Sequence, residues 1–326
     1  MIRYVLKRVL VMIPILIAVA ILIFALMYVV PGDPSVILIG ENPTPEQIAQ
    51  MNAVYGFDDP FLVQLGRYLY NLFFKGSFGR SYIYGLDVGK AILERFPRTL
   101  ILAVGSVIVS IVVGVSLGVF SAMHANRLGD RVTLFVSMLL HSMPEFWLAL
   151  LLVLLFSLKL GWLPATGAAS WKNYVLPIVA NSTVSLANIM RQTRSSMLDV
   201  IRADYVSTAR SKGLKERAVI WGHALPNALI PVVTVIGSRF GHLLGGTAVI
   251  ETIFVLPGIG SYMVNGLGSQ DYPVVQGTVV YIAFTFSIIM LVTDVLYAFI
   301  DPRIKAKYIK QKRKKAAEAK APAMGG

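Results

Sequence analysis

Apolar residues gather along the chain into long continuous runs that are separated by short polar segments. Most of the runs reach the ~20 residues that a helix needs to cross the hydrocarbon of a bilayer. Each is expected to be helical, because backbone polar groups in lipid must be satisfied within the segment. The pattern therefore predicts an all-α polytopic membrane protein with six transmembrane helices, at residues 9–30, 99–123, 132–158, 174–190, 228–250 and 276–300.

The fourth run is the weakest, because proline and polar side chains dilute its hydrophobicity. The charges beside it decide whether it spans. Seven basic residues lie between Arg191 and Arg217, and cytoplasmic segments carry an excess of Lys and Arg. If the fourth run did not span, this basic loop would lie outside the cell. Six spans with both termini in the cytoplasm form the consistent arrangement.

Composition agrees with a membrane protein. Hydrophobic residues make up 56% of the 326 residues and charged residues 14%, and the mean hydropathy is +0.68. A formal net charge of +13 would favour nucleic acid as the partner of a soluble protein. Here the cations cluster between apolar runs, so we expect no nucleic-acid partner. The chain has no cysteine, which excludes disulfides and thiolate metal sites.

This layout divides the chain into four regions. They are the N-terminal tail with the first span at 1–30, an extracytoplasmic segment at 31–98, the other five spans at 99–300 and a basic cytoplasmic tail at 301–326. A tail of this charge is expected to lie near anionic lipid.

Two helices are predicted within the extracytoplasmic segment. Thr44-Pro45-Glu46-Gln47 offers an N-cap, a first-turn proline and a Gln three residues after the cap, which predicts a short helix through Met51. A second amphipathic helix is predicted from Phe61 to Phe74. We expect these helices to cap the outer side without chemistry of their own, or to contact a protein that delivers the cargo.

The most distinctive polar stretch lies in the cytoplasmic loop at 191–227. Apolar positions from Met197 to Gly213 repeat at helical spacing and predict one helix. Gly213 is well placed to end that helix in a left-handed turn. A second short helix from Lys215 to Leu225 would lead back to the membrane. A helix, a glycine corner and a return helix would form a rigid projection suited to a partner.

The order Ser207-Thr208-Ala209, Gly213 and Leu225-Pro226 resembles the cytoplasmic loop of permease subunits of ABC-type importers. The family usually has Glu-Ala-Ala in the first three places, so no role of that acidic residue is implied here. Further motifs extend the resemblance over nearly the whole chain and are similar to the oligopeptide and dipeptide branch: Pro31-Gly32-Asp33-Pro34, Arg95-Phe96-Pro97-Arg98-Thr99-Leu100, Met143-Pro144-Glu145-Phe146, Gly161-Trp162-Leu163-Pro164, Glu251-Thr252-Ile253-Phe254, Asp271-Tyr272-Pro273 and Asp301-Pro302-Arg303.

The resemblance implies the type I ABC importer permease fold in a bacterial or archaeal inner membrane. It implies a second related permease, two ATPase subunits, an extracytoplasmic substrate-binding protein and a peptide cargo. The chain would form half of the pathway and dock into an ATPase subunit through Asp204, Tyr205, Ser207, Thr208, Ala209, Arg210, Lys212, Gly213, Leu214 and His223. No phosphate-binding loop of the Gly-x-x-x-x-Gly-Lys-Ser/Thr type occurs, so ATP and Mg are expected on the ATPase subunits and no cofactor on this chain.

Two alternatives stay open at this point. The same scaffold also imports glutathione, nickel chelates or other small solutes, and the sequence does not distinguish these cargoes. An intramembrane protease is the less favoured alternative, since it needs a Ser-His pair or an acidic dyad. The Gly114-x-Ser-x-Gly118 run lies within an apolar span and is better explained as a close helix-packing face. The four histidines show no metal-ligand spacing, so no metal site is predicted.

Three ionisable residues lie deep in predicted spans: Glu145, Arg239 and Asp294. A charge at the bilayer centre costs about 2.5 to 3.5 kcal/mol on insertion scales, so each should face protein or a wet cavity. We expect Glu145 or Arg239 to border the translocation path of a zwitterionic peptide, or else to form a structural ion pair, which is favoured for Asp294. The polar face of the fourth span is a further candidate for the same cavity, with Asn181, Ser185 and Asn188.

Overall fold

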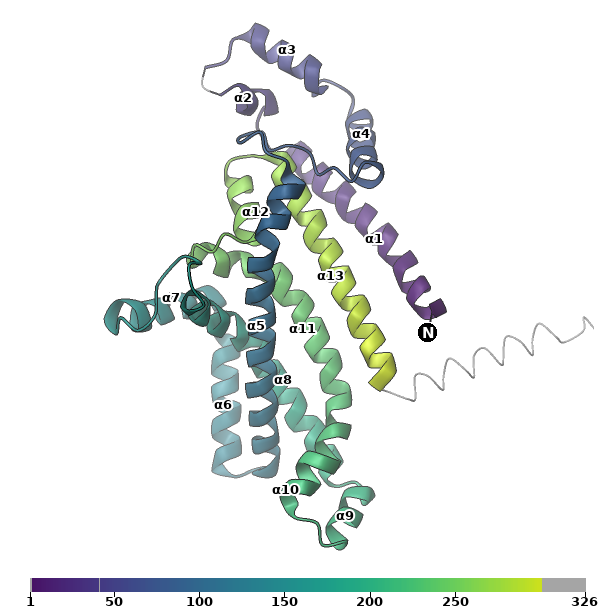
Figure 1. Ribbon diagram of the computed structural model, residues 1–326, viewed down its shortest axis with the longest axis vertical. Coiled ribbons are helices and arrows are strands. Elements are labelled where there is room, and N and C mark those ends of the chain that lie inside the picture. Colours follow the sequence, from purple (N-terminus) through teal and green to yellow (C-terminus); the bar gives the residue numbers. More distant parts are fainter. Residues whose placement is uncertain (1, 41, 301–326) are drawn as a thin grey trace, which may run out of the picture.

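The computed structural model describes residues 2–40 and 42–300 (Figure 1). This part of the chain is built from helices, as predicted. In chain order they are α1 (Ile2–Val29), α2 (Pro34–Ile39), α3 (Pro45–Tyr55), α4 (Phe61–Phe74), α5 (Val88–Met123), α6 (Leu128–Ser142), α7 (Glu145–Leu152), η1 (Val153–Lys159), α8 (Lys172–Ile201), α9 (Asp204–Ser211), α10 (Glu216–Ala218), η2 (Val219–Ala224), α11 (Leu225–Ile253), α12 (Ile259–Gly268) and α13 (Tyr272–Ile300). The predicted basic tail lies outside the described residues.

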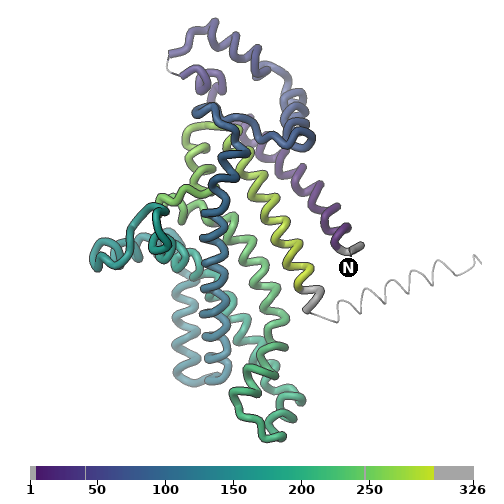
Figure 2. The backbone as a smooth tube through the Cα atoms, viewed as in Figure 1, coloured from purple at the N-terminus to yellow at the C-terminus, as the bar shows by residue number. Residues whose placement is uncertain are grey.

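Among the described residues, four segments are long and apolar enough to cross a membrane by themselves: Val5–Val29, Val88–Met123, Glu216–Gly245 and Tyr272–Leu296. They correspond to α1, to α5, to the continuous helix formed by α10, η2 and the first part of α11, and to α13. These are long helices of the molecule (Figure 2). A bent pair of helices, Leu128–Ser142 with Glu145–Lys159, brings the total to as many as five. The first, second, fifth and sixth predicted spans thus have clear counterparts.

The third predicted span is wrong as a single helix. The chain bends by 102° between α6 and the α7–η1 segment. Pro144 stands at the break, and Met143 before it adopts an extended conformation with ψ 129°. Proline disfavours the helical conformation of the preceding residue and cannot donate a backbone hydrogen bond, so the apolar run is divided into two helices.

The fourth predicted span corresponds to α8, a continuous helix of 30 residues. It is less apolar than the other crossing helices, because it carries several polar residues, many of them buried. It lies between α5 and α11, against which it packs along its length. Position alone marks it as a sixth crossing helix, so the count of six spans stays a prediction.

Close contact between α5 and α8 depends on small residues. A Cβ added at Gly118 would lie 2.6 Å from the Thr193 Cβ and 2.7 Å from the Met190 carbonyl oxygen, and one at Gly114 would lie 3.0 Å from the carbonyl oxygen of Leu186. The predicted close-packing role of Gly114 and Gly118 is confirmed. The same run lies inside a continuous helix, whereas a nucleophile elbow needs a strand-to-helix turn.

The segment at 31–98, predicted to be extracytoplasmic, forms helices as predicted. Thr44 caps α3 through a reciprocal bond pair with Gln47, at 3.3 and 2.9 Å, and the helix continues to Tyr55, beyond the predicted Met51. The predicted second helix is α4, whose buried Leu72 packs against α1. Figure 1 places α2 to α4 at one end of the molecule and α9 with α10 at the opposite end.

Candidate functional site

The predicted projection is present, and we define residues 204–224 as the knob. Its first helix differs from the prediction. Instead of one helix from Met197 to Gly213, α8 ends at Ile201 and α9 starts at Asp204, after an extended Ala203 with ψ 146°. The break turns α9 back toward the protein, where its apolar side chains are buried. This burial sets the direction of α9, and the periodicity of the sequence did not indicate it.

Gly213 forms the predicted corner, with a left-handed φ of 77°. A Cβ at this position would meet no atom within 4 Å, so the backbone conformation rather than crowding favours glycine. The predicted return helix from Lys215 to Leu225 is also present. It begins as α10, continues as the π-helix η2 and runs directly into α11.

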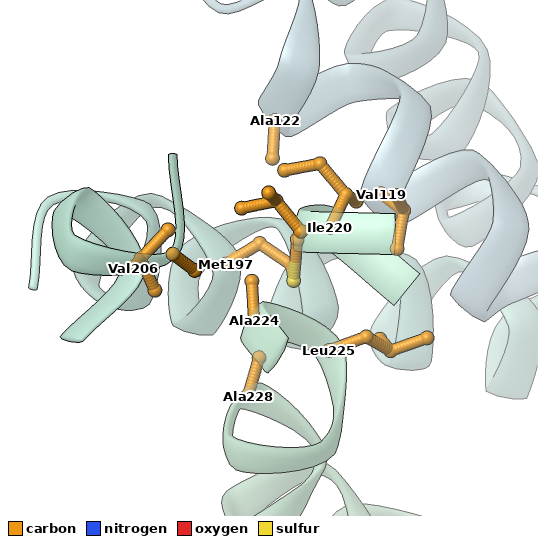
Figure 3. Packing of buried hydrophobic residues seen from close by; sticks show 10 residues of the cluster. Val119, Ala122, Met197, Val206, Ile220, Ala224, Leu225 and Ala228 are labelled. Atoms are coloured by element: carbon orange, nitrogen blue, oxygen red, sulfur yellow. The ribbon is translucent and has the colours of Figure 1, made fainter. Parts of the chain in front are cut away.

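The knob is anchored by a buried apolar cluster (Figure 3). Val206 is 0% exposed and Ala209 is 6% exposed. They pack with Met197 of α8, Ala122 of α5 and Ile220 of η2. Ala209 therefore contacts the interior of this chain, and the opposite face of the knob is the one that a partner can reach.

That opposite face is polar and includes large side chains. Tyr205 is 44% exposed and Leu214 is 43% exposed. Arg210 bonds Glu216 across the corner at 2.8 Å, which raises the pKa of the guanidinium above its usual value and holds the two arms of the knob together. The other predicted docking residues on the exposed surface are Asp204, Ser207, Thr208, Lys212, Gly213 and His223.

Sequence reasoning missed a neighbouring groove. A cavity of about 290 Å³ lies between the end of α5 and the knob, lined in part by Phe120, His124, Arg217 and Trp221. Trp221 is 49% exposed. In the sequence Trp221 lies within the predicted return helix from Lys215 to Leu225, and the turn at Gly213 places it beside α5.

The ionisable residues of the spans fall into two groups. Asp294 of α13 pairs with Arg8 of α1 at 3.0 Å, as favoured from the sequence. Glu145 lies at the start of α7, directly after the bend, and Arg239 lies on α11. Both are half-buried, and Arg239 acts electrostatically on the Glu145 carboxylate. The structure thus brings these two charges from distant segments into one neighbourhood.

The polar face of α8 is largely used within the chain. Asn181 is 1% exposed and donates to the Ser106 hydroxyl of α5 at 3.1 Å. Ser185 is 4% exposed. Asn188 donates to the Val184 carbonyl at 2.7 Å. These contacts join α8 to α5 and to its own preceding turn, and a role in the translocation path stays a prediction.

A residue cluster to which the sequence analysis gave no site role, although Glu251 and Thr99 belong to family motifs, lies at the end of α11 farthest from the knob. We call this end of the molecule the outer end and the knob end the inner end. Glu251 is 1% exposed and accepts hydrogen bonds from the Thr99 hydroxyl at 2.7 Å, the Thr247 hydroxyl at 3.1 Å and the Ser261 backbone N–H at 2.9 Å. We call these residues the outer carboxylate cluster. It joins α5, α11 and α12 with neutral donors. Among the described residues, no group of three potential metal ligands is present.

The fold and the knob together define a polytopic transport permease. Residues 114–306 match the family described as "Binding-protein-dependent transport system inner membrane component". Residues 1–103 match its N-terminal family, "Binding-prot-dependent transport system membrane comp, N-term". The chain belongs to this family. It is a multi-pass inner-membrane permease subunit, not an enzyme, and ATP is bound by ATPase partners in a system that also includes a permease partner and a binding protein.

Relatives cover nearly the whole chain. The glutathione transport system permease protein GsiC of Salmonella paratyphi A is 41% identical over 307 residues, which are 94% of this chain and 100% of the relative. A Brucella abortus protein, provisionally named a peptide transport system permease protein, is 41% identical over 309 residues, with 92% and 98% covered. An amino acid ABC transporter crystal structure aligns with a TM-score of 0.48 and 15% identity over 66% of this chain and 94% of that chain.

Proposed function

We propose that this chain forms half of an import pathway for di- and oligopeptides and that the knob docks into an ATPase subunit. The observation that carries the docking role is the two-sided construction of the knob. One face, with Val206 and Ala209, is sealed into the core, while the other presents Tyr205 and Leu214 to the surroundings. A projection built in this way can transmit force, because it cannot shift without moving α5 and α8.

The proposed assembly has two ATPase subunits, a second related permease and an extracytoplasmic binding protein. The proposed topology has six crossings and both termini in the cytoplasm. Its support is the arrangement in Figure 1, where α1 begins and α13 ends toward the knob and away from α2 to α4. The excess of basic residues in the loop that contains the knob supports the same orientation.

Glu145 and Arg239 are proposed to border the pathway. The support is their half-buried position and their electrostatic interaction across two helices. A peptide carries both an ammonium and a carboxylate group. Glu145 can attract the ammonium and Arg239 the carboxylate as the peptide passes the bend at Pro144.

Glutathione is the second candidate cargo, because the glutathione permease relative is as similar to this chain as the peptide relative, at 41% identity each. Uptake by the complete transporter in liposomes separates the two. Accumulation of labelled dialanine supports the peptide assignment, whereas accumulation of labelled glutathione alone contradicts it.

The docking role is tested with Gly213→Val. A β-branched residue in the left-handed region is strained by about 1–2 kcal/mol or more, so the corner should open and the ATPase subunits should no longer co-purify. ATP-dependent uptake should fall to background while membrane insertion persists. Gly85→Val is the matched control, since Gly85 also has a left-handed φ of 64° with no neighbour within 4 Å of a Cβ but lies in the extracytoplasmic segment. Undiminished uptake in the Gly213 variant would contradict the proposal.

A further inference from the structure

An ion pair between a buried carboxylate and a partly exposed arginine joins α6 to α8 close to the knob. Asp130 lies in the first turn of α6 and is 1% exposed. It receives two hydrogen bonds from the guanidinium of Arg194 on α8, from Nε at 2.7 Å and from Nη2 at 2.7 Å. Two parallel bonds of this kind fix both distance and orientation, so the start of α6 is held in one position relative to α8.

The same carboxylate also accepts hydrogen bonds from the end of α5 and from the turn that follows it. The Ser121 hydroxyl of α5 donates to one oxygen of Asp130, and the backbone N–H of Asn126 donates to the other at 2.8 Å. Asn126 has a left-handed φ of 66°, so this turn depends on a conformation that the carboxylate helps to stabilise. One side chain thus connects three helices and a turn.

These contacts are continuous with the anchor of the knob. Ser121 directly precedes Ala122, and Arg194 lies one helical turn before Met197. Ala122 and Met197 belong to the cluster that buries Val206 of α9 (Figure 3). The ion pair and the knob therefore share two helices, α5 and α8, and are separated along each of them by no more than one turn.

Stability alone is a weak reason for such a pair. A buried ion pair often contributes no more than well-packed apolar side chains of the same volume, although removal of one partner is costly. What a bidentate pair adds is a defined geometry between the elements that it joins. A defined geometry matters where the movement of one helix must be transmitted to another.

We propose that Asp130 and Arg194 are positioning residues that make the cytoplasmic ends of α5, α6 and α8 move with the knob as one body. Displacement of α9 by an ATPase subunit then reaches α6 and, through α6, the bend at Pro144. The proposal rests on the docking role proposed above for the knob.

The test uses the complete transporter with both permeases, the ATPase subunits and the binding protein, reconstituted in liposomes. The cargo is labelled dialanine or labelled glutathione, whichever the wild-type complex accumulates. Arg194→Lys keeps the charge but loses the bidentate geometry, and Asp130→Asn keeps the shape but loses the charge. In both variants we expect the ATPase subunits to co-purify and the binding protein to stimulate ATP hydrolysis. The number of cargo molecules imported per ATP should fall at least about fivefold.

The ratio of transport to hydrolysis separates positioning from a merely structural role. If the pair only supports the fold, uptake and hydrolysis should fall in parallel and the ratio should stay unchanged, which would overturn the proposal. Arg67→Gln is the control, because Arg67 forms an ion pair with Asp59 in the extracytoplasmic segment; its ratio should equal that of the wild type. Loss of ATPase co-purification in Gly213→Val but not in Asp130→Asn keeps the two proposals distinguishable.

Discussion

The two ends of the molecule hold buried carboxylates in different ways. At the knob end, Asp130 is opposed by a full positive charge, that of Arg194. At the outer end, Glu251 is surrounded by hydroxyls and a backbone N–H. Asp271 likewise accepts from the Ser81 hydroxyl and from the Tyr82 backbone N–H at 3.0 Å. The buried carboxylates Glu251 and Asp271 of the outer end are held by neutral hydrogen-bond donors, whereas the inner end combines a charged pair with the surface proposed to receive force.

The largest effect is expected from Glu251→Ala, which attacks the outer carboxylate cluster. The substitution leaves the Ser261 N–H and the Thr99 hydroxyl without their acceptor and opens a cavity. At about 1–3 kcal/mol for each orphaned buried group, we expect a loss of about 3 to 5 kcal/mol, seen as poor yield and a lowered melting temperature in detergent by tryptophan fluorescence.

Glu251→Gln sharpens the comparison between the ends. Its amide oxygen can accept from the Ser261 N–H, while its NH₂ group can turn toward the threonine hydroxyls, which are able to accept. The loss of stability should be less than half that of the alanine variant. If the glutamine and alanine variants were equally unstable, neutral hydrogen bonding would not explain the outer end.

A smaller loss is expected from Gly118→Ala at the inner end. The added Cβ would meet the Met190 carbonyl oxygen at 2.7 Å, and a backbone atom cannot move aside without shifting a helix. Overpacking of this kind typically costs about 1–3 kcal/mol. Gly66→Ala in α4 is the control, since nothing lies within 4 Å of its added Cβ. A melting temperature that is lowered equally in both variants would argue against the close contact of α5 and α8.

The smallest effect is expected from Thr44→Ala at the outer end. It removes the capping box of α3, whose reciprocal bonds involve Gln47, and N-cap loss costs about 0.5–2 kcal/mol. Because α3 has no buried residues, the change should stay local. Faster hydrogen exchange in the first turn of α3 with normal uptake is the expected result, and a substantial loss of uptake would show that α3 has a role beyond the fold.

Features encoded within a few neighbouring residues were predictable from the sequence. The run Thr44-Pro45-Glu46-Gln47 predicted α3. Amphipathic spacing predicted α4 with the observed bounds, and Gly213 predicted the corner of the knob. Apolar run length located α1, α5, α11 and α13. These signals are local, because helix capping and periodicity involve residues that are close in the chain.

Features set by distant residues were not predictable in the same way. Asp130 and Arg194 are 64 residues apart, and Thr99 and Glu251 are 152 apart, so no pattern in the sequence connects them. The break before α9 follows from the burial of Val206 and Ala209 against other helices. The bend at Pro144 had a local signal, but the continuity of the apolar run concealed it.

The unbroken passage from η2 into α11 has a consequence for the two ends together. At 1.5 Å per residue, the 29 residues of α11 extend over about 44 Å, from directly behind the knob to the Glu251 carboxylate. Because η2 and α11 are continuous, a rotation imposed on η2 would be passed along a helix whose far end contacts α5 and α12. Under the docking role proposed above, a displacement of the knob would reach the contact of α11 with α5 and α12 through a single helix.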